Sequence, residues 1–289
     1  MSTAKTIKTV VSSELVNMGG HIIDQPLPIE GVPNIDPFLL IHHWKGALVG
    51  GQREREVGVG PHPHRGFSPV TFVFEGNVVH RDSLGNKAKV EEGGTQWMFA
   101  GRGITHSERH DKEFVEKGGP LEFIQFWVNV PAENKMGAPY YKPISKSETP
   151  VISTQHDEIY VVAGELDGVA GVAPTFTEQT LLRGKINRGG KRTLTLPTNY
   201  NILLYALDGE LKVNGETVHG KEMVVFENDG EEVNVEGVFD TRYIVLSGEA
   251  IGEKIESYGP YVMNNQTEIM EAMRDYQIGK MGILIEDFD

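Results

Sequence analysis

The chain has 289 residues, with 27 Lys and Arg against 41 Asp and Glu, which gives a formal net charge of −14. At roughly 100–200 residues per domain, this length predicts one large domain or two modest ones. An acidic protein repels a phosphate backbone, which argues against direct binding of nucleic acid. Hydrophobic residues make up 39% of the chain, enough for a packed core, and the absence of cysteine excludes disulfides, thiolate metal sites and cysteine nucleophiles.

The first residues of the chain contain no continuous apolar stretch and no clear cleavage site, so we predict no signal peptide. The longest apolar run, Ile202–Leu207, is far shorter than the ~20 residues that span a bilayer. We therefore expect a cytoplasmic protein without a membrane segment.

Short apolar runs separated by glycine, asparagine and aspartate recur along the whole chain. Runs of this length are typical of β-sandwiches and barrels rather than of strands alternating with helices. Asn214-Gly215 has the sequence of a two-residue hairpin turn, because both turn positions need a positive φ. The predicted strands, in chain order, are Val70–Phe74, Phe123–Val130, Ile159–Ala163, Thr193–Leu196, Ile202–Leu207, Met223–Phe226 and Tyr243–Leu246.

One amphipathic helix is predicted near the C-terminus. Asn265 is a candidate N-cap with Glu268 as its capping-box partner, and Gly279 is expected to end the helix. The helical period predicts one apolar face that packs against a sheet. That face contains Ile269, Met273 and Tyr276.

A domain boundary is expected between Pro131 and Pro150, where the sequence is polar and rich in proline. This stretch separates two strand-rich halves. We therefore predict an N-terminal domain over residues 1–135 and a C-terminal domain over residues 136–289 that includes the helix.

The densest cluster of functional residues is the segment PHPHRGF at Pro61–Phe67. His62 and His64 stand at i and i+2 around a proline, so on an extended segment both point to one face. His106 and Glu108 have the same spacing in a glycine-rich stretch. If the two segments lie close together in one barrel, three imidazoles and one carboxylate converge on a point. Such a set resembles non-haem iron sites that keep positions open for substrate or oxygen.

The remaining histidines of the first half are weaker candidates. His42 and His43 are consecutive, so on a strand they face opposite sides and at most one can approach a site. His80 and His110 are single histidines, for which packing is favoured over a direct catalytic role. Arg102, between two glycines, is either a contact for an anionic substrate or a brace for its loop.

The second half of the chain lacks a histidine pair. Its histidines, His156 and His219, have no partner at i+2. We therefore expect the second half to be structural.

Six segments with specific sequences together resemble the pirin family of the cupin superfamily. They are DPFLLIHHW (Asp36–Trp44), PHPHRGF (Pro61–Phe67), HRDSLGN (His80–Asn86), QWMFAGRGITHSE (Gln96–Glu108), GGPLEFIQFWVNVP (Gly118–Pro131) and YGPYVMN (Tyr258–Asn264). The resemblance covers nearly the whole chain. It implies an all-β protein with two tandem cupin barrels, each a jelly roll or double-stranded β-helix, and a short C-terminal helix.

The resemblance also implies a metal in the N-terminal barrel only, held by His62, His64, His106 and Glu108. The family metal is usually taken as Fe(II), and related cupins accept manganese, nickel, copper or zinc. The general cupin pattern has a glutamate about four residues after the second histidine, but here Ser68 and Pro69 occupy that region. The carboxylate must therefore come from Glu108, as in pirins.

Similarity to bacterial pirins implies a dioxygenase of the quercetin 2,3-dioxygenase type, with a flavonol or a similar enolate or catecholate and O2 as substrates. In that reaction some bacterial members open flavonols to a depside and carbon monoxide. Glu108 is then also the candidate catalytic base.

Two alternatives stay open at this stage. Animal pirins suggest an iron-binding, redox-sensing regulator that contacts a transcription factor, and some bacterial ones a partner of a metabolic enzyme. A purely structural ion or an isomerase-type cupin is the third reading. A closed structural site is disfavoured, because structural zinc usually has four ligands that include thiolates. No residue pattern indicates a sugar phosphate as substrate.

Overall fold

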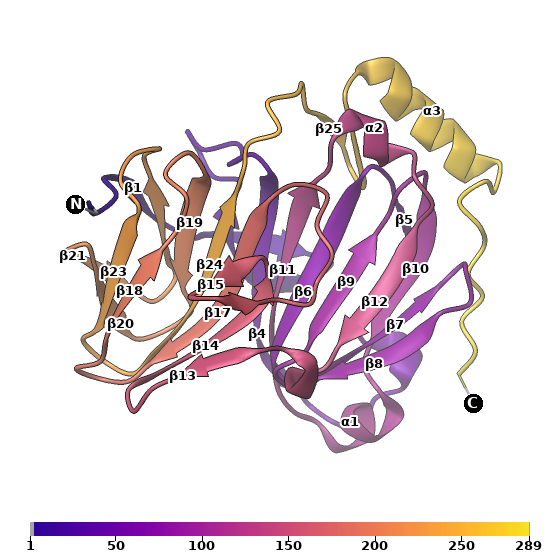
Figure 1. Cartoon of the computed structure of the whole chain (residues 1–289). Coiled ribbons are helices and arrows are strands. Elements are labelled where there is room, and N and C mark those ends of the chain that lie inside the picture. Colours follow the sequence, from indigo (N-terminus) through magenta and orange to yellow (C-terminus); the bar gives the residue numbers. More distant parts are fainter. Residues whose placement is uncertain (1–2, 289) are drawn as a thin grey trace. The chain divides into compact units, whose positions relative to one another are not determined.

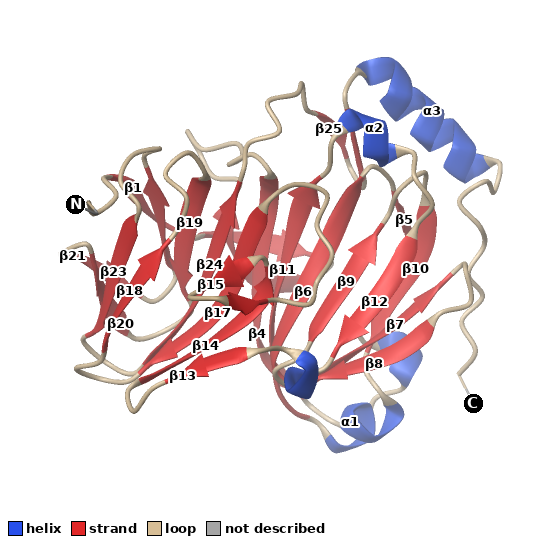
Figure 2. Cartoon of the chain, viewed as in Figure 1, coloured by secondary structure: helices blue, strands red, loops and turns tan. Residues whose placement is uncertain are grey.

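The computed structural model describes residues 3–288, which form antiparallel sheets with few and short helices (Figures 1 and 2). The chain divides into two compact units. The apolar unit contains the chain up to His42 together with Ser147–Ile251, and the histidine unit contains His43–Lys146 together with the chain from Gly252 onward. None of the helices among the described residues is long and apolar enough to cross a membrane.

The apolar unit is built around a seven-stranded antiparallel sheet and a four-stranded antiparallel sheet. The larger sheet has the order β1 (Ile7–Ser12), β22 (Glu222–Phe226), β19 (Asn201–Ala206), β24 (Thr241–Gly248), β17 (Gln179–Ile186), β14 (Asp157–Ala163) and β13 (Val151–Ser153). The smaller sheet has the order β18 (Lys191–Thr195), β23 (Glu232–Gly237), β20 (Glu210–Val213) and β21 (Glu216–His219). Strand β2 (Glu14–Met18) pairs with β3 (His21–Leu27) at the end of a second seven-stranded sheet. A separate two-stranded hairpin is formed by β15 (Glu165–Leu166) and β16 (Val169–Ala170).

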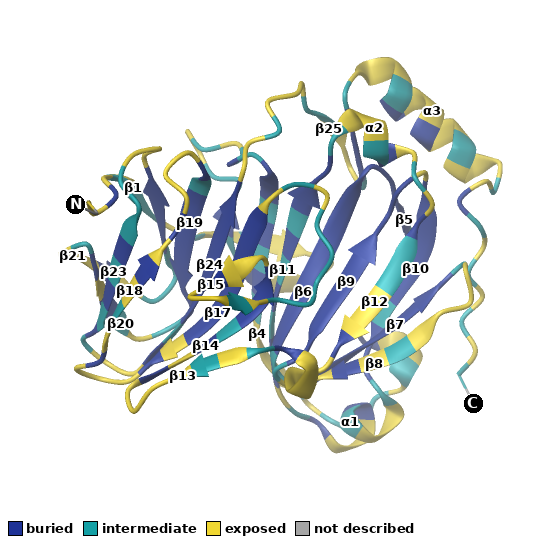
Figure 3. Cartoon of the chain, in the orientation of Figure 1, coloured by how far each residue is buried: buried dark blue, intermediate teal, exposed yellow. Residues whose placement is uncertain are grey.

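The histidine unit has the same type of architecture. One sheet has the order β5 (Val59–His64), β10 (Ile104–Arg109), β7 (Asn77–Asp82) and β8 (Lys87–Glu91). In the other sheet β12 (Tyr140–Ile144), β9 (Thr95–Phe99), β6 (Phe67–Glu75) and β11 (Gly119–Asn129) follow one another, and β4 (Phe38–Leu48) begins in the apolar unit and ends in this one. The hairpin of β25 (Glu256–Tyr258) and β26 (Tyr261–Met263) leads to the last helix. Figure 3 shows β6, β9 and β10 as largely buried.

The predicted all-β fold of two cupin barrels with a C-terminal helix is confirmed. Each predicted strand overlaps a strand of the structure. The hairpin between β20 and β21 turns at Asn214 and Gly215, whose φ angles are 45° and 90°. The positive φ required by a two-residue turn is therefore present at both positions.

The division into units differs from the two continuous domains, 1–135 and 136–289, that the sequence predicted. Strand β1 from the N-terminus pairs with β22, and the C-terminal helix belongs to the histidine unit. The N-terminal strand thus belongs to the unit formed mainly by the second half of the chain, and the C-terminal helix belongs to the unit formed mainly by the first half. Strand pairing joins residues that are far apart in sequence, so a change of composition along the chain cannot locate such an exchange.

Helix α3 (Gln266–Gln277) begins where the sequence predicted it. The side chain of Asn265 accepts a hydrogen bond of 3.0 Å from the backbone N–H of Glu268. The apolar face, however, was assigned wrongly in part. Ile269 and Ala272 are the buried residues of the helix, whereas Met273 and Tyr276 are 36% and 38% exposed. The buried face is rotated because its apolar partners are Tyr261, Met263 and Met281.

Four short helical segments were not predicted. They are α1 (Lys112–Lys117), α2 (Ala132–Lys135) and the 3-10 turns Glu54–Glu56 and Lys146–Glu148. Segments of this length span less than two helical turns, which is too short for an apolar period to appear in the sequence.

Candidate metal centre

Three histidines converge inside the histidine unit. His62 and His64 lie on β5, which pairs with β10 so that His106 stands opposite His62. Ligand atoms of the three rings all lie within 4.8 Å of one another. The centroid of the His106 ring is 4.3 Å from that of His62 and 5.0 Å from that of His64. The structure therefore brings together the two segments that the sequence predicted would meet.

Each of the three rings uses Nδ1 for a hydrogen bond. Nδ1 of His62 is 2.8 Å from the carbonyl oxygen of Gly60, and Nδ1 of His64 is 3.3 Å from that of Pro260. Nδ1 of His106 is 3.4 Å from Nδ1 of His80. A carbonyl oxygen only accepts, so Nδ1 carries the proton in His62 and His64. In the neutral ring this leaves the lone pair of Nε2 free for a ligand.

The remaining nitrogen of His106 is the feature that tests whether a metal fits. Among residues 3–288, Nε2 of His106 is buried and has no hydrogen-bond partner. A buried polar atom without a partner costs about 1–3 kcal/mol. A metal ion coordinated by this nitrogen would remove that cost, and imidazole is a donor that iron, zinc, copper and nickel accept. The residues present therefore fit a metal ion.

Burial keeps the two deepest rings neutral. His64 and His106 are 4% and 1% exposed, and this burial lowers the pKa of both imidazoles well below the usual value. Repulsion from the neighbouring His62 lowers both pKa values further. Neutral imidazole is the form that binds a metal.

Glu108 stands two residues after His106 on β10. The pairing of β10 with β5 shifts register between these residues, so that Glu108 lies opposite Val59. Its carboxylate accepts hydrogen bonds from Nε2 of Gln125, at 3.0 and 2.9 Å, and from Nε2 of Gln96, at 3.2 Å. The group of mutually close ligand atoms contains the histidines and not Glu108. A role for Glu108 as fourth ligand or as base therefore stays a prediction.

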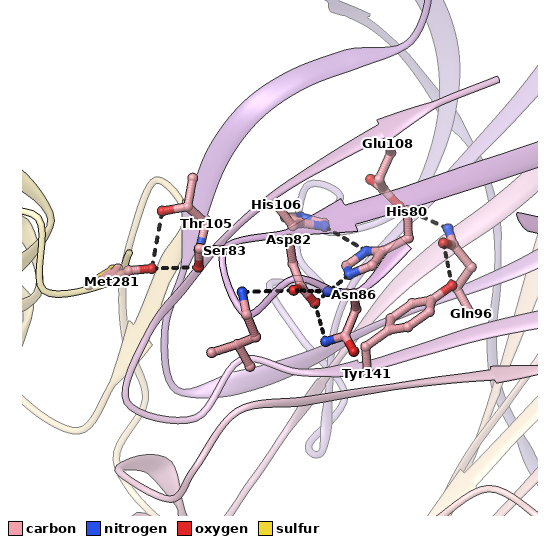
Figure 4. A network of polar contacts seen from close by, with 11 residues as sticks. His80, Asp82, Ser83, Asn86, Gln96, Thr105, His106, Glu108, Tyr141 and Met281 are labelled. Atoms are coloured by element: carbon pink, nitrogen blue, oxygen red, sulfur yellow. Dashed lines mark hydrogen bonds and ion pairs between the residues drawn. The ribbon is translucent and has the colours of Figure 1, made fainter. Parts of the chain in front are cut away.

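Two glutamines and a tyrosine on the facing sheet were missed by the sequence analysis. Gln125 lies on β11 and Gln96 on β9, and the hydroxyl of Tyr141 on β12 donates to Oε1 of Gln96 at 2.9 Å (Figure 4). The ring of Tyr141 stacks on that of His80, with centroids 3.7 Å apart and planes at 1°. Gln125 interrupts an apolar run in β11, and Gln96 directly precedes the apolar run of β9. A polar amide at such a position was the signal that the sequence offered.

His80 also has a larger role than the sequence predicted. Its Nε2 is 2.8 Å from Oδ2 of Asp82. Burial alone would raise the pKa of Asp82, but hydrogen bonds from His80 and Asn86 outweigh burial and hold this pKa below the usual value. Asp82 is thus a hydrogen-bond acceptor for His80 and Asn86, as Figure 4 shows.

The other single candidates do not join the cluster. His42 contacts Gln25 at 2.9 Å and His43 contacts Glu122 at 3.0 Å, so the consecutive rings face different surroundings, as predicted. Nδ1 of His110 is 2.6 Å from the carbonyl oxygen of Asn77. The side chains of Arg102, His156 and His219 are exposed.

Buried polar contacts hold the loop that follows His64. The ammonium of Lys135 donates to the carbonyl oxygen of Gly66 at 2.7 Å and to Oδ1 of Asn129 at 2.6 Å. Gly66 has φ +87°, and a Cβ added there would lie 2.0 Å from the carbonyl oxygen of Val262. Only glycine fits this position, because it needs both the left-handed conformation and the close approach.

Two antiparallel β units, one with three converging histidines, define a two-barrel cupin protein with a candidate metal centre. Family models agree with this class. The model described as Pirin matches residues 21–128, and the model described as Pirin C-terminal cupin domain matches residues 181–282. The chain belongs to the pirin family. A cupin barrel with such a histidine cluster indicates one metal ion.

Relatives with similar sequences span nearly the whole chain. A protein of Pseudomonas aeruginosa with the name "Putative quercetin 2,3-dioxygenase PA2418" is 35% identical over 91% of this chain and 95% of its own length. The human protein named pirin is 30% identical over 97% of this chain and 95% of its own length. The crystal structure of a quercetin 2,3-dioxygenase from Acinetobacter baumannii has a TM-score of 0.92 and 34% identity, covering 98% of this chain and 100% of that chain.

Proposed function

We propose that this protein is a metal-dependent dioxygenase of the quercetin 2,3-dioxygenase type, acting on flavonols with O2. The ion would be divalent, with Fe(II) favoured, and held by His62, His64, His106 and Glu108. Manganese, nickel, copper and zinc are the other candidates, since they accept the same nitrogen and oxygen donors. Four protein ligands on a six-coordinate ion leave about two positions for substrate and oxygen.

One observation carries the metal centre. Nδ1 of each histidine in the cluster has a hydrogen-bond partner, and ligand atoms of the three rings lie within 4.8 Å of one another. With Nδ1 engaged in each ring, Nε2 is the nitrogen left to bind the ion. A hydrogen bond at the ring nitrogen that does not bind the metal orients a metal-binding histidine.

The metal, when bound, would lower the pKa of a substrate hydroxyl, and the deprotonated substrate itself would supply the electrons that reduce O2. The residues of the chain would bind and orient the substrate. The carboxylate of Glu108 is partly exposed and is held by the amide of Gln125, so one of its oxygens can accept the proton of a flavonol hydroxyl.

A pair of aromatic rings beside His64 supports the proposal of a planar substrate. The ring centroids of Phe67 and Trp127 lie 5.2 and 5.5 Å from that of His64, and 4.3 Å from each other. Phe67 is fully buried and Trp127 is half-buried, so Trp127 is the ring of this pair that a planar aromatic ligand could reach for stacking. The names of the relatives from Pseudomonas aeruginosa and Acinetobacter baumannii point to the same substrate class.

Oxygen uptake with quercetin tests this proposal. We expect the iron-loaded protein to consume oxygen, and the His62→Ala variant treated in the same way to fall to the background of the metal-free protein. The exposed His156 offers a matched control, because His156→Ala removes a histidine outside the cluster. No uptake above background by the wild-type protein, with iron or with the other divalent metals, would exclude quercetin as substrate.

An iron-dependent regulator that contacts a transcription factor or a metabolic enzyme stays a prediction. Fe(II) and Fe(III) differ by one charge, which can bias a nearby surface. A pull-down whose partners change with the oxidation state of the iron would favour this function. Cytoplasmic location likewise stays a prediction.

A further inference from the structure

His106 differs from the other two histidines of the cluster in what fixes its ring. His62 and His64 direct Nδ1 to carbonyl oxygens of the main chain, whereas Nδ1 of His106 faces Nδ1 of His80 at 3.4 Å. His80 in turn directs Nε2 to Oδ2 of Asp82 at 2.8 Å. His80 and His106 are both 1% exposed, so water does not replace these contacts.

The direction of each hydrogen bond in this series follows from Asp82. Its Oδ1 accepts the backbone N–H groups of Leu84 and Asn86, and its Oδ2 accepts the side-chain amide of Asn86, so this carboxylate is an acceptor throughout. The nitrogen of His80 that faces it must donate. A neutral His80 then accepts at Nδ1, and His106 donates from Nδ1. The lone pair of His106 is thereby placed on Nε2, the buried nitrogen without a partner among the described residues.

The position of His80 is itself fixed from the facing sheet. Its ring lies flat against that of Tyr141, with 3.7 Å between centroids. The hydroxyl of Tyr141 donates to Gln96, whose amide donates to Glu108 (Figure 4). His80 therefore has a stacking partner that is tied to Glu108 and a hydrogen bond that ends at His106.

We propose that His80, oriented by Asp82, is a positioning residue that sets the tautomer and ring orientation of His106 and so strengthens metal binding. This inference rests on the proposed metal centre. Outer partners of this kind typically change metal affinity by about 10- to 100-fold when they are lost. In the sequence, His80 is a single histidine with Asp82 two residues further on.

Cobalt(II) provides a probe that does not depend on turnover. We expect His80→Phe, which keeps a ring against Tyr141 but has no nitrogen, to bind Co(II) about 10- to 100-fold more weakly in a chelator competition. The visible absorption bands of Co(II) bound to this variant are expected to shift relative to the wild type, because the His106 ring is no longer fixed. His80→Asn, which has an acceptor near the position of Nδ1, is expected to recover part of the affinity.

His110→Phe is the matched control, since His110 is a buried histidine of the same unit whose Nδ1 faces the main chain at Asn77. Its Co(II) affinity and spectrum should equal those of the wild type. Equal affinity and spectrum for His80→Phe would overturn the role of His80. A wild-type protein that binds no Co(II), or that binds it equally after His62→Ala, would instead overturn the metal centre, and the inference with it.

A second measurement covers the case in which His80→Phe does not fold. In the zinc-loaded wild-type protein, nitrogen NMR of the histidine rings should show a proton on Nδ1 of His106 and on Nε2 of His80. A proton on Nδ1 of His80 would contradict the inferred direction of the hydrogen bonds.

Discussion

The interiors of the two units differ in what fills them. The apolar unit has a large hydrophobic core that includes Leu204, Val245 and Tyr243. It also buries polar side chains such as Arg183 and Asp157, but none of its described histidines is buried. In the histidine unit, His64, His106 and Gln96 are buried among the apolar residues. Both units are antiparallel β structures of the same class, so the difference arises from side chains and not from topology.

This comparison indicates what a polar interior requires. Burying a polar group without a partner is costly, and the histidine unit meets this cost with hydrogen bonds to main-chain oxygens, to Asp82 and between amides and Glu108. The apolar unit meets the same cost where it buries Lys5, whose ammonium donates to the carbonyl oxygens of Thr198 and Asp229. Its hydrophobic core depends on a fit of shapes. At Gly184, for example, an added Cβ would lie 2.2 Å from the ring of Tyr243 on the paired strand. The cluster of buried histidines is therefore what distinguishes the interior of the histidine unit.

The largest expected effect is loss of the metal on removal of a histidine from the cluster. We expect His106→Ala to bind Co(II) more than a hundredfold more weakly, beyond the effect typical of an outer partner. The exposed His219 of the apolar unit gives the control His219→Ala, which should bind as the wild type does. Chelator competition measures both, and unchanged affinity in His106→Ala would mean that the ion binds elsewhere.

A core substitution in the apolar unit should affect stability and leave metal binding unchanged. Leu204 is fully buried, so Leu204→Ala is expected to lower the free energy of unfolding by about 2–5 kcal/mol. Leu15 of the same unit is 72% exposed, and Leu15→Ala should change it by less than about 0.5 kcal/mol. Urea denaturation measures the two variants. A reduced metal stoichiometry in folded Leu204→Ala would show that the interiors are not independent in function.

Two glycines with nearly equal φ angles separate backbone strain from close packing. Gly66 has φ +87° and Gly85 has φ +88°, but the Cβ of an alanine at position 66 would lie 2.0 Å from the oxygen of Val262. At position 85 no described atom lies within 4 Å of it. We expect Gly85→Ala to cost about 1 kcal/mol from the left-handed conformation alone, and Gly66→Ala about 2–3 kcal/mol with weaker Co(II) binding. Equal costs in urea denaturation would contradict the contact with Val262.

The stability of the metal-free protein should also depend on pH. The pKa values of His64 and His106 lie well below the usual value in the folded protein, so below about pH 6.5 the unfolded chain binds more protons than the folded one. The stabilisation is complete above that pH and is lost as the pH falls, by up to about 1.4 kcal/mol per pH unit for each group. Urea denaturation measures the free energy of unfolding between pH 7 and pH 5. Its fall with pH should be smaller in the double variant that combines His64→Phe with His106→Phe. An unchanged slope in that double variant would exclude these histidines as its source.

The strands, the hairpin at Asn214 and the capping of the last helix by Asn265 followed from the sequence. These features depend on local rules: alternation of side chains, turn residues with positive φ, and a cap that reaches a nearby N–H. The apolar face of the helix was predicted only in part, because Tyr261 and Met263, which lie against it, come from a separate hairpin. The exchange of terminal segments between the units was missed because it involves pairing over long distances in sequence.

For the site, the sequence by itself determined the histidine pair His62 and His64 and the second pair His106 and Glu108, since a spacing of two on a strand is enough to place side chains on one face. Only the tertiary structure decided that β5 and β10 are neighbours, that His80 contacts His106 and that the two glutamines hold Glu108. The contacts of His80 with His106 and of the glutamines with Glu108 join side chains of different strands, and those of the glutamines also join different sheets. Such contacts depend on how strands pair and how sheets face each other, which no local pattern records.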